Sequence, residues 1–332
     1  MEIMVKNKFM TQIPSFEFQI LNVKEIDPLE ARYCFRYSLE DALLIQSIKT
    51  YGVLSPLFGF SQPDGRLGLI SGFKRFYAAL KLEIRELPIM VLRSTFPEKE
   101  LVKIVFEQNR NGVYSSLDQA VAVTKLISIL GFSREEVRKE FLPCLGLNPS
   151  QKVLEEYEKI SKLDQEILEG IARGEVSFRG ISEWADFSGE EQGFLWENAL
   201  ALFHFTSSEL SECASLLEDL IAMNNRSVQK ILECPEIQSL IKQAKDSHQR
   251  QKAQPLIDCL KQMRYPKSHE IRKLFREKIA KLKFKNPIQL CKSDSMEEEG
   301  VELKIRLVKR DSIGKALQEL SEKRSEIEEI IE

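Results

Sequence analysis

The segment Leu69–Leu80 constrains the fold of this chain more than any other. An apolar stretch typical of a strand runs into Ser71 and Gly72, and the apolar periodicity of a helix follows directly. The backbone N–H groups in the first turn of a helix have no partner within the helix, and the helix dipole is positive at that end. Because Lys74 and Arg75 add two cations at the same point, the segment predicts a binding site for an anion, above all a phosphate.

The residues around this turn predict an α+β domain. Alternating apolar residues indicate a strand near the start of the chain, and extended segments follow at 53–60 and 87–92. Helical patterns at 38–51 and 73–82 lie between these strands. We therefore expect the strands and helices of residues 1–112 to form one α+β domain that carries the predicted phosphate site.

The rest of the chain is predicted to be mainly helical and to contain two further strands. Helical periodicity dominates residues 113–235, and one long helical pattern covers 236–262. Strict alternation predicts a strand over 301–307, and an apolar stretch predicts its neighbour at 287–291. We expect a mainly α-helical second domain over 113–235. Residues 236–332 are then a basic helix followed by a small C-terminal β-hairpin plus helix that serves in assembly.

The net charge of −3 conceals a strong separation of charges along the chain. From Glu155 to Glu236 there are 18 acidic and 6 basic residues, whereas from Lys242 to Lys292 there are 15 basic and 4 acidic residues. Such separation indicates distinct surfaces for distinct partners, with the acidic middle suited to a protein and the basic segment to DNA. The alternative is that both are solvated faces that partly neutralise each other.

The composition argues against several classes of protein. No apolar run approaches the roughly 20 residues of a membrane helix, and the start of the chain lacks the features of a secretory signal. The six cysteines are scattered without a C-x-x-C pair, as in a reduced cytosolic protein. No Ser/His/Asp or Cys/His arrangement is visible, so an enzyme of those classes is not expected.

Four motifs in order resemble the N-terminal domain of the ParB/sulfiredoxin superfamily, and in particular the ParB-type chromosome partition proteins. They are a G-x-x-R-x-x-A turn at Gly72, Arg75 and Ala78, an upstream Gly-aliphatic-x-x-Pro element at Gly52–Pro56, an aliphatic-Pro-aliphatic strand at Leu87–Ile89, and a partial Glu-Asn-x-x-Arg element that starts at Glu107. The sulfiredoxin branch needs a reactive cysteine in this turn. Here Phe73 and Lys74 occupy those positions, so sulfinic-acid repair is not expected.

The resemblance implies that the turn binds the phosphates of CTP together with Mg²⁺. The residues predicted to contact this nucleotide are Pro56, Ser71, Gly72, Phe73, Lys74, Arg75, Glu107, Gln108 and Arg110. Glu107 would also help to place the metal ion. The chain departs from the family where Gln108 replaces an asparagine and Asn111 replaces an arginine, although Arg110 lies one residue away. Loss of a cation beside a triphosphate weakens binding and impedes hydrolysis more, so a CTP hydrolase is less expected than a CTP-binding protein.

Residues 117–186 resemble the ParB central domain, which carries a helix-turn-helix. Ser133–Val137 fits the first helix of that motif and Ser150–Lys162 fits the second. Gln151 and Lys152 are the predicted DNA contacts, because the first residues of a recognition helix reach the base edges. Three carboxylates oppose DNA binding if they face the groove and are harmless if they point to solvent, namely Glu155, Glu156 and Glu158.

The basic segment 242–292 is a second candidate surface for DNA. Its predicted phosphate contacts are Lys281, Lys283 and Lys285. The C-terminal strands offer an edge for symmetric pairing, so a homodimer is expected.

Together these features predict a cytoplasmic bacterial protein of the ParB type that binds CTP and associates with DNA, hence with the nucleoid, in chromosome or plasmid partition or a related mobile-element process. The alternative that the residues leave open is a regulatory or scaffold protein. Such a protein would keep the ParB-like fold, would have lost specific DNA reading and nucleotide hydrolysis, and would bind a protein partner through the acidic middle.

Overall fold

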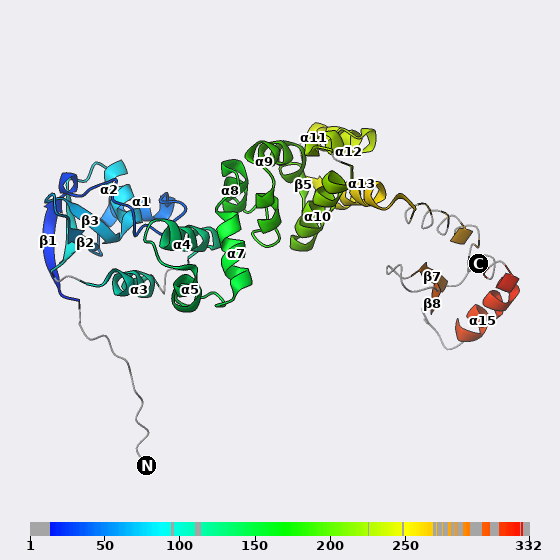
Figure 1. Cartoon of the computed structure of the whole chain (residues 1–332), viewed down its shortest axis with the longest axis horizontal. Helices are drawn as coiled ribbons and strands as arrows, with labels where there is room; N and C mark the ends of the chain where they lie inside the picture. Colours follow the sequence, from blue (N-terminus) through cyan, green and yellow to red (C-terminus); the bar gives the residue numbers. More distant parts are fainter. Residues whose placement is uncertain are drawn as a thin grey trace, which may run out of the picture. The chain divides into compact units, whose positions relative to one another are not determined.

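The structure is a computed structural model, drawn as a ribbon in Figure 1. It describes residues 14–93, 96–109, 114–224, 226–247 and 249–267, isolated positions between 270 and 284, and residues 288–292, 301–305, 312–325 and 327. Contacts within the chain define two units, the first formed by Met1–Ala214 with Ile241–Lys252 and the second by Ser215–Leu240 with Ala253–Glu332. The domain boundaries at 112 and 235 stay predictions.

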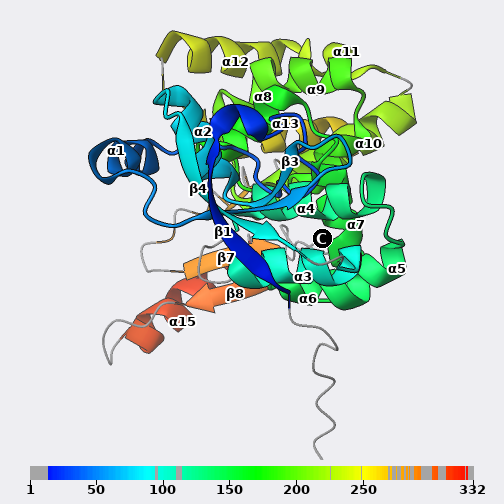
Figure 2. The ribbon, with the colours of Figure 1, turned by 90° about the vertical axis from the view of Figure 1, so that its left-hand side faces the viewer.

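A mixed four-stranded sheet forms the centre of the N-terminal part. Its strands are β1 (Phe16–Asn22), β2 (Leu57–Ser61), β3 (Leu67–Ser71) and β4 (Glu86–Leu92). Their order is β1-β4-β2-β3, with β1 antiparallel to β4, β4 parallel to β2, and β2 antiparallel to β3. Figure 2 shows β1 running beside β4. This sheet and its helices confirm the predicted α+β domain.

One face of the sheet is covered by helix α2 (Phe73–Lys81). Phe76 and Ala79 of this helix pack with Leu57, Ile89 and other buried sheet residues in one apolar cluster. Helix α1 (Ala42–Tyr51) packs against α2. The helix predicted from residue 38 starts later than expected, because the Asp41 side chain accepts the Leu44 N–H at 3.1 Å and so caps the helix.

The opposite face of the sheet carries apolar side chains near β1. The alternation of Phe16, Phe18 and Ile20 indicates a strand correctly, but Phe18 is 57% and Ile20 is 63% exposed. Phe18 pairs with Met90 of β4, so these side chains lie on the face that α2 does not cover.

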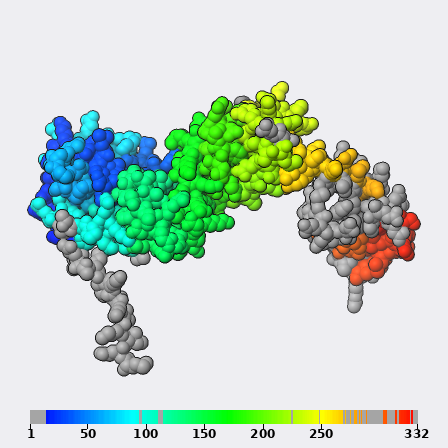
Figure 3. Space-filling view, viewed as in Figure 1, coloured from blue at the N-terminus to red at the C-terminus, as the bar shows by residue number. Residues whose placement is uncertain are grey.

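The residues that follow are mostly helical. The next elements are α3 (Glu98–Gln108), α4 (Ser116–Ser128), α5 (Arg134–Glu136), the π-helical segment η2 (Val137–Phe141), α6 (Leu142–Cys144), α7 (Gln151–Ile160) and α8 (Gln165–Ala172). Phe106 of α3 contacts Phe35 and Phe141, with ring centroids 4.9 and 6.3 Å apart. Helix α3 thus shares a core with η2, and the surface passes from the α+β part to the following helices without a gap (Figure 3).

The remaining elements are helices of 3 to 18 residues, two two-residue strands and a hairpin. They are η1 (Val23–Glu25), η3 (Ser182–Asp186), α9 (Gly189–Leu195), the π-helical η4 (Trp196–Leu200), β5 (Phe203–His204), α10 (Ser207–Asn224), α11 (Val228–Leu232), α12 (Pro235–Ser247), β6 (Gln251–Lys252), α13 (Gln254–Arg264), β7 (Ile288–Lys292), β8 (Val301–Ile305) and α15 (Ser312–Glu322). Strands β7 and β8 pair antiparallel, where two neighbouring strands are predicted. Within the described part of the chain, no helix has the length and apolar character needed to span a bilayer.

The single helix predicted over 236–262 is wrong, because α12 and α13 are separate helices. Between them, β6 pairs in parallel with β5, and Gln251 N–H donates to the Leu202 carbonyl at 2.9 Å. The Arg250 guanidinium donates to the Phe203 carbonyl at 2.6 Å and to that of Leu200. These contacts with a distant segment compensate for the helical hydrogen bonds that are lost at the break.

Candidate anion-binding pocket

The turn between β3 and α2 has the geometry that the sequence predicts. Gly72 is the N-cap of α2, with a left-handed φ of 99°, and no side chain caps the helix. A Cβ at this position would lie 2.9 Å from the Leu57 Cγ, so a larger residue meets both backbone strain and a clash. The first turn of α2 therefore presents its N–H groups and the positive end of its dipole.

Arg75 lies in this first turn, and its side chain is partly buried. One terminal nitrogen donates to the Ser55 and Pro56 carbonyls at 2.7 and 2.6 Å. Burial lowers the pKa of Arg75, and no carboxylate pairs with it among the residues that the structure describes. Carbonyl oxygens satisfy N–H donors but leave the positive charge uncompensated, which favours an anion nearby.

Lys74 and Ser71 flank the same turn. Lys74 Nζ lies 3.3 Å from the Asp41 carboxylate, and both side chains are about one-third exposed. The Leu44 N–H, followed by Lys74, lowers the pKa of Asp41. Ser71, the last residue of β3, is buried at 7% exposure. The turn thus carries Lys74, which is paired with Asp41, the buried hydroxyl of Ser71, and Arg75, which contacts no carboxylate of the described residues.

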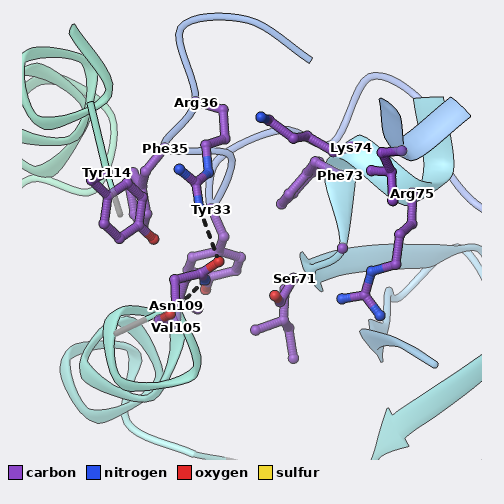
Figure 4. A pocket seen from close by; sticks show the side chains of 13 residues that line it. Tyr33, Phe35, Arg36, Ser71, Phe73, Lys74, Arg75, Val105, Asn109 and Tyr114 are labelled. Atoms are coloured by element: carbon purple, nitrogen blue, oxygen red, sulfur yellow. Dashed lines mark hydrogen bonds between the residues drawn. The ribbon is translucent and has the colours of Figure 1, made fainter. Parts of the chain in front are cut away.

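A cavity of about 220 Å³ opens at this turn (Figure 4). Its wall consists of Tyr33, Phe35, Arg36, Leu44, Ile70, Ser71, Gly72, Phe73, Lys74, Arg75, Val105, Asn109 and Tyr114. In Figure 4, Arg36, Asn109 and Tyr114 lie on one side of this pocket, while Ser71 and Arg75 lie on the other. None of these wall residues is acidic, so the donors suit an anion and would not hold a bare cation.

Arg36 is the functional candidate that the sequence reasoning missed. It donates to Asp118 Oδ2 at 3.0 Å and to Asn109 Oδ1 at 3.2 Å. Its guanidinium also lies over the Tyr114 ring, 4.3 Å from the centroid. Arg36 thereby joins the end of α3 to the start of α4. A second cavity of about 440 Å³ shares Arg36 and Lys74 with this pocket.

The predicted nucleotide residues divide into three groups. Five of them line the pocket, namely Ser71, Gly72, Phe73, Lys74 and Arg75. Pro56 contributes through its carbonyl, which holds Arg75. Glu107 and Gln108 are exposed at the end of α3 and lie outside the pocket wall, where Asn109 is found instead. Arg110 lies outside the described residues, and the metal role of Glu107 stays a prediction.

Aromatic residues occupy every second position of Tyr33–Tyr37, and Arg36 stands between two of them, which is a local sequence signal for this segment. Its contacts with Asn109 and Asp118 nevertheless join positions more than 70 residues apart, and no local pattern encodes such pairs. No group of three or more His, Cys, Asp or Glu residues that could hold a metal ion occurs in the part of the chain that the structure describes.

The predicted DNA contacts of the second helix lie at the start of α7. Gln151 and Lys152 are exposed, but Gln151 Nε2 donates to Glu155 Oε1 at 2.7 Å. Glu155 is exposed on the same side of the helix, whereas Glu158 is paired with Arg134 through two hydrogen bonds, one of 3.0 Å. Glu155 and the partly exposed Glu156, one turn after Gln151 and Lys152, therefore accompany the residues predicted to reach the groove. The other predicted DNA contacts lie outside the described residues, namely Lys281, Lys283 and Lys285.

Comparisons with known proteins give distant relatives. No family model matches the chain. Nucleoid occlusion proteins of Bacillus thuringiensis (strain Al Hakam) and Bacillus cereus (strain B4264) are each 24% identical over 178 residues, which is 53% of this chain and 58% of the relative. The match thus spans little more than half the length of these curated relatives.

Solved ParB structures also match the chain. The C-terminally truncated chromosome-partitioning protein ParB from Caulobacter crescentus, complexed to the centromeric parS site, is 15% identical over 59% of this chain and 98% of its own, with a TM-score of 0.35. A Pnob8-like ParB-N domain is 13% identical over 70% and 99%, with a TM-score of 0.36. The resemblance predicted from the motifs is confirmed to this extent: part of the chain is similar in sequence to nucleoid occlusion proteins, and solved ParB structures are among its matches.

Proposed function

We propose that this protein is a DNA-associated protein of the ParB type that binds a nucleotide, CTP, with Mg²⁺ in the pocket at the β3–α2 turn. Its role would lie in chromosome or plasmid partition or a related mobile-element process. The similarity to nucleoid occlusion proteins supports the DNA association, and the motif resemblance supports the choice of CTP.

The single observation that carries the nucleotide proposal is the environment of Arg75. Its partly buried guanidinium is held by two carbonyls, with no carboxylate partner among the described residues, directly beside the open first turn of α2. A phosphate group would supply the missing negative charge and would accept hydrogen bonds from the helix N–H groups. Ser71 and Lys74 would add a hydroxyl and a second cation.

The pocket wall fits the phosphates better than it fits a metal ion or a hydrolytic reaction. Because it contains no carboxylate, Mg²⁺ would come with the nucleotide and be held mainly by phosphate and water. The described wall also contains no Asp, Glu or His side chain that could act as a general base and activate water for hydrolysis. We therefore propose nucleotide binding without rapid hydrolysis.

Isothermal titration calorimetry of the full chain with CTP, ATP and GTP, each with Mg²⁺, tests this proposal. We expect binding by the wild type and a loss of affinity of about tenfold or more in Arg75→Ala, because a charge-assisted contact is removed. The matched control is Arg85→Ala, which removes an exposed arginine of the same domain outside the pocket. Absence of heat with all three nucleotides would contradict the proposal.

A second candidate function is favoured by the surface of α7. Glu155 lies beside Gln151 on the exposed side of this helix, which opposes approach to the phosphates of a duplex. A regulatory or scaffold protein that binds a protein partner through the acidic middle would not need that approach. DNA binding as a function of salt, described in the Discussion, separates the two candidates.

A further inference from the structure

Arg36, a residue of the wall of the proposed nucleotide pocket, forms a partly buried ion pair with Asp118, which lies behind that wall and lines the neighbouring cavity. The Arg36 side chain is 16% exposed and that of Asp118 is 10% exposed. Arg36 lies on the side of the pocket opposite the phosphate-like turn (Figure 4). Arg36 is therefore a second guanidinium in this pocket, and it is supplied by a segment that has no part in the predicted motifs.

We propose that Arg36 is a phosphate-binding residue of this pocket and that a bound nucleotide replaces Asp118 as its anionic partner. This inference rests on the proposed function. It implies a ligand with several phosphates, because cationic groups stand on both sides of the pocket. Arginine binds phosphate oxygens with two parallel N–H donors, which makes phosphate an effective competitor of a carboxylate.

Asp118 can release Arg36 because other donors hold its carboxylate. Oδ1 accepts the Tyr37 N–H at 2.8 Å, and Oδ2 accepts the Ser115 N–H at 3.0 Å. The loss of one partner of a buried ion pair is costly mainly when the remaining charge is left without hydrogen bonds. The Asp118 carboxylate therefore keeps two backbone hydrogen bonds after Arg36 has left it for a phosphate group.

Arg36 stays in the pocket during this exchange because two neutral groups also hold it. The Tyr114 ring supports the guanidinium by a cation–π contact, and Asn109 Oδ1 accepts one of its N–H groups. Neither group competes for the charge. The exchange therefore alters the contact with Asp118, the residue that forms the capping box of α4 with Ser115.

A double-mutant cycle in calorimetry with Mg²⁺–CTP tests this inference. We expect Arg36→Gln to lower the affinity about tenfold, because one charge-assisted contact with phosphate is lost. Asp118→Asn should raise the affinity several-fold, because the competing charge is removed. Its single side-chain oxygen keeps one of the two backbone N–H groups of Tyr37 and Ser115, and the other loses its acceptor. In the double variant Arg36→Gln/Asp118→Asn, the gain in affinity from Asp118→Asn should disappear. Without the Arg36 guanidinium, residue 118 and the phosphate no longer compete for a common partner.

Hydrogen exchange of the Tyr37 amide gives a second readout. Because Asp118 holds this amide, we expect its exchange rate to change when CTP binds to the wild type and to remain unaffected by CTP in Arg36→Gln. Circular dichroism and thermal melting check that each variant is folded. If Arg36→Gln does not fold, Arg36→Lys replaces it, which keeps the charge but loses the two-pronged contact.

The outcomes separate this inference from the proposed function. If the wild type binds CTP and Asp118→Asn leaves the affinity unchanged or lowers it, the exchange is wrong and the nucleotide pocket stands. The same conclusion follows if Arg36→Gln binds as tightly as the wild type. If the wild type binds no nucleotide at all, the proposed function and this inference both fail.

Discussion

At the residue scale, Gly72 determines whether the β3–α2 turn can form. Two separate requirements meet at this position, a left-handed φ of 99° and the close approach of Leu57. At Gly65 only the left-handed backbone requires glycine, since its φ is 85° and a Cβ there would meet no atom within 4 Å. The two glycines therefore allow backbone strain and steric clash to be separated.

We expect Gly72→Ala to destabilise the fold more than Gly65→Ala. Both variants pay about 1–2 kcal/mol for an L-residue in the left-handed region. Gly72→Ala also forces Leu57 to move, which adds a packing cost of about 1–3 kcal/mol. Urea unfolding of the two variants measures the difference, and equal losses of stability would show that Leu57 accommodates the methyl group.

At the element scale, ion pairs connect α3 to the helical segment that begins with α5. Lys99 of α3 lies 3.1 Å from Glu136 and 2.5 Å from Glu140, and Lys103 lies 3.0 Å from Glu140. Hydrogen bonds from Ser133, followed by Lys99, lower the pKa of Glu136 to about 2. Both α3 and the cap of α5 therefore depend on the charge of this carboxylate.

This low pKa predicts acid sensitivity. A carboxylate whose folded pKa is about 2, against 4.5 for the free group, adds stability above pH 4.5 that is lost as the pH falls from 4.5 toward 2. We expect Glu136→Gln to be less stable than the wild type at pH 7, with a smaller difference at pH 3 that disappears only as the pH falls through the folded pKa of about 2. Urea midpoints at both pH values measure this, with the exposed Glu86→Gln as control. A constant difference between wild type and Glu136→Gln would contradict the assignment.

At the scale of the whole molecule, the separation of charges decides which partners can approach. The acidic stretch Glu155–Glu236 includes α7 to α11, whereas the basic stretch Lys242–Lys292 begins within α12. Contacts assign Ile241–Lys252 to the first unit, so the start of the basic stretch belongs to the same unit as the first part of the acidic one. If α7 does not reach the groove, we expect the basic residues beyond α13 to carry the contact with DNA.

We expect DNA binding of the full chain to weaken steeply with salt and to depend on the basic stretch. Replacement of Lys281, Lys283 and Lys285 together by alanine should reduce the slope of log K against log salt by about three, close to one for each lost phosphate contact. The control is the double variant Lys24→Ala/Lys49→Ala, which removes exposed cations of the α+β part. An unchanged slope in the triple variant would exclude these lysines from the DNA surface. Absence of DNA binding by the wild type would favour the regulatory candidate.

The sequence by itself determined those features that depend on near neighbours in the chain. The β3–turn–α2 unit is one of them, because Gly72 adopts its φ without strain and the apolar period of α2 is set within nine residues. The hydrogen bonds of helices and caps form between residues three or four apart, so their patterns are visible without a tertiary structure. The motifs that carry the ParB resemblance are of this local kind.

Only the tertiary structure decided which distant residues meet. Arg36 lies beside Asn109 and Asp118 because the segment before α1 packs between α3 and α4, and Glu107 lies outside the pocket because α3 turns it to solvent. The exposure of Phe18 depends on which sheet face α2 covers. Such pairings follow from burial and packing over the whole unit, which a one-dimensional pattern of residue types does not encode.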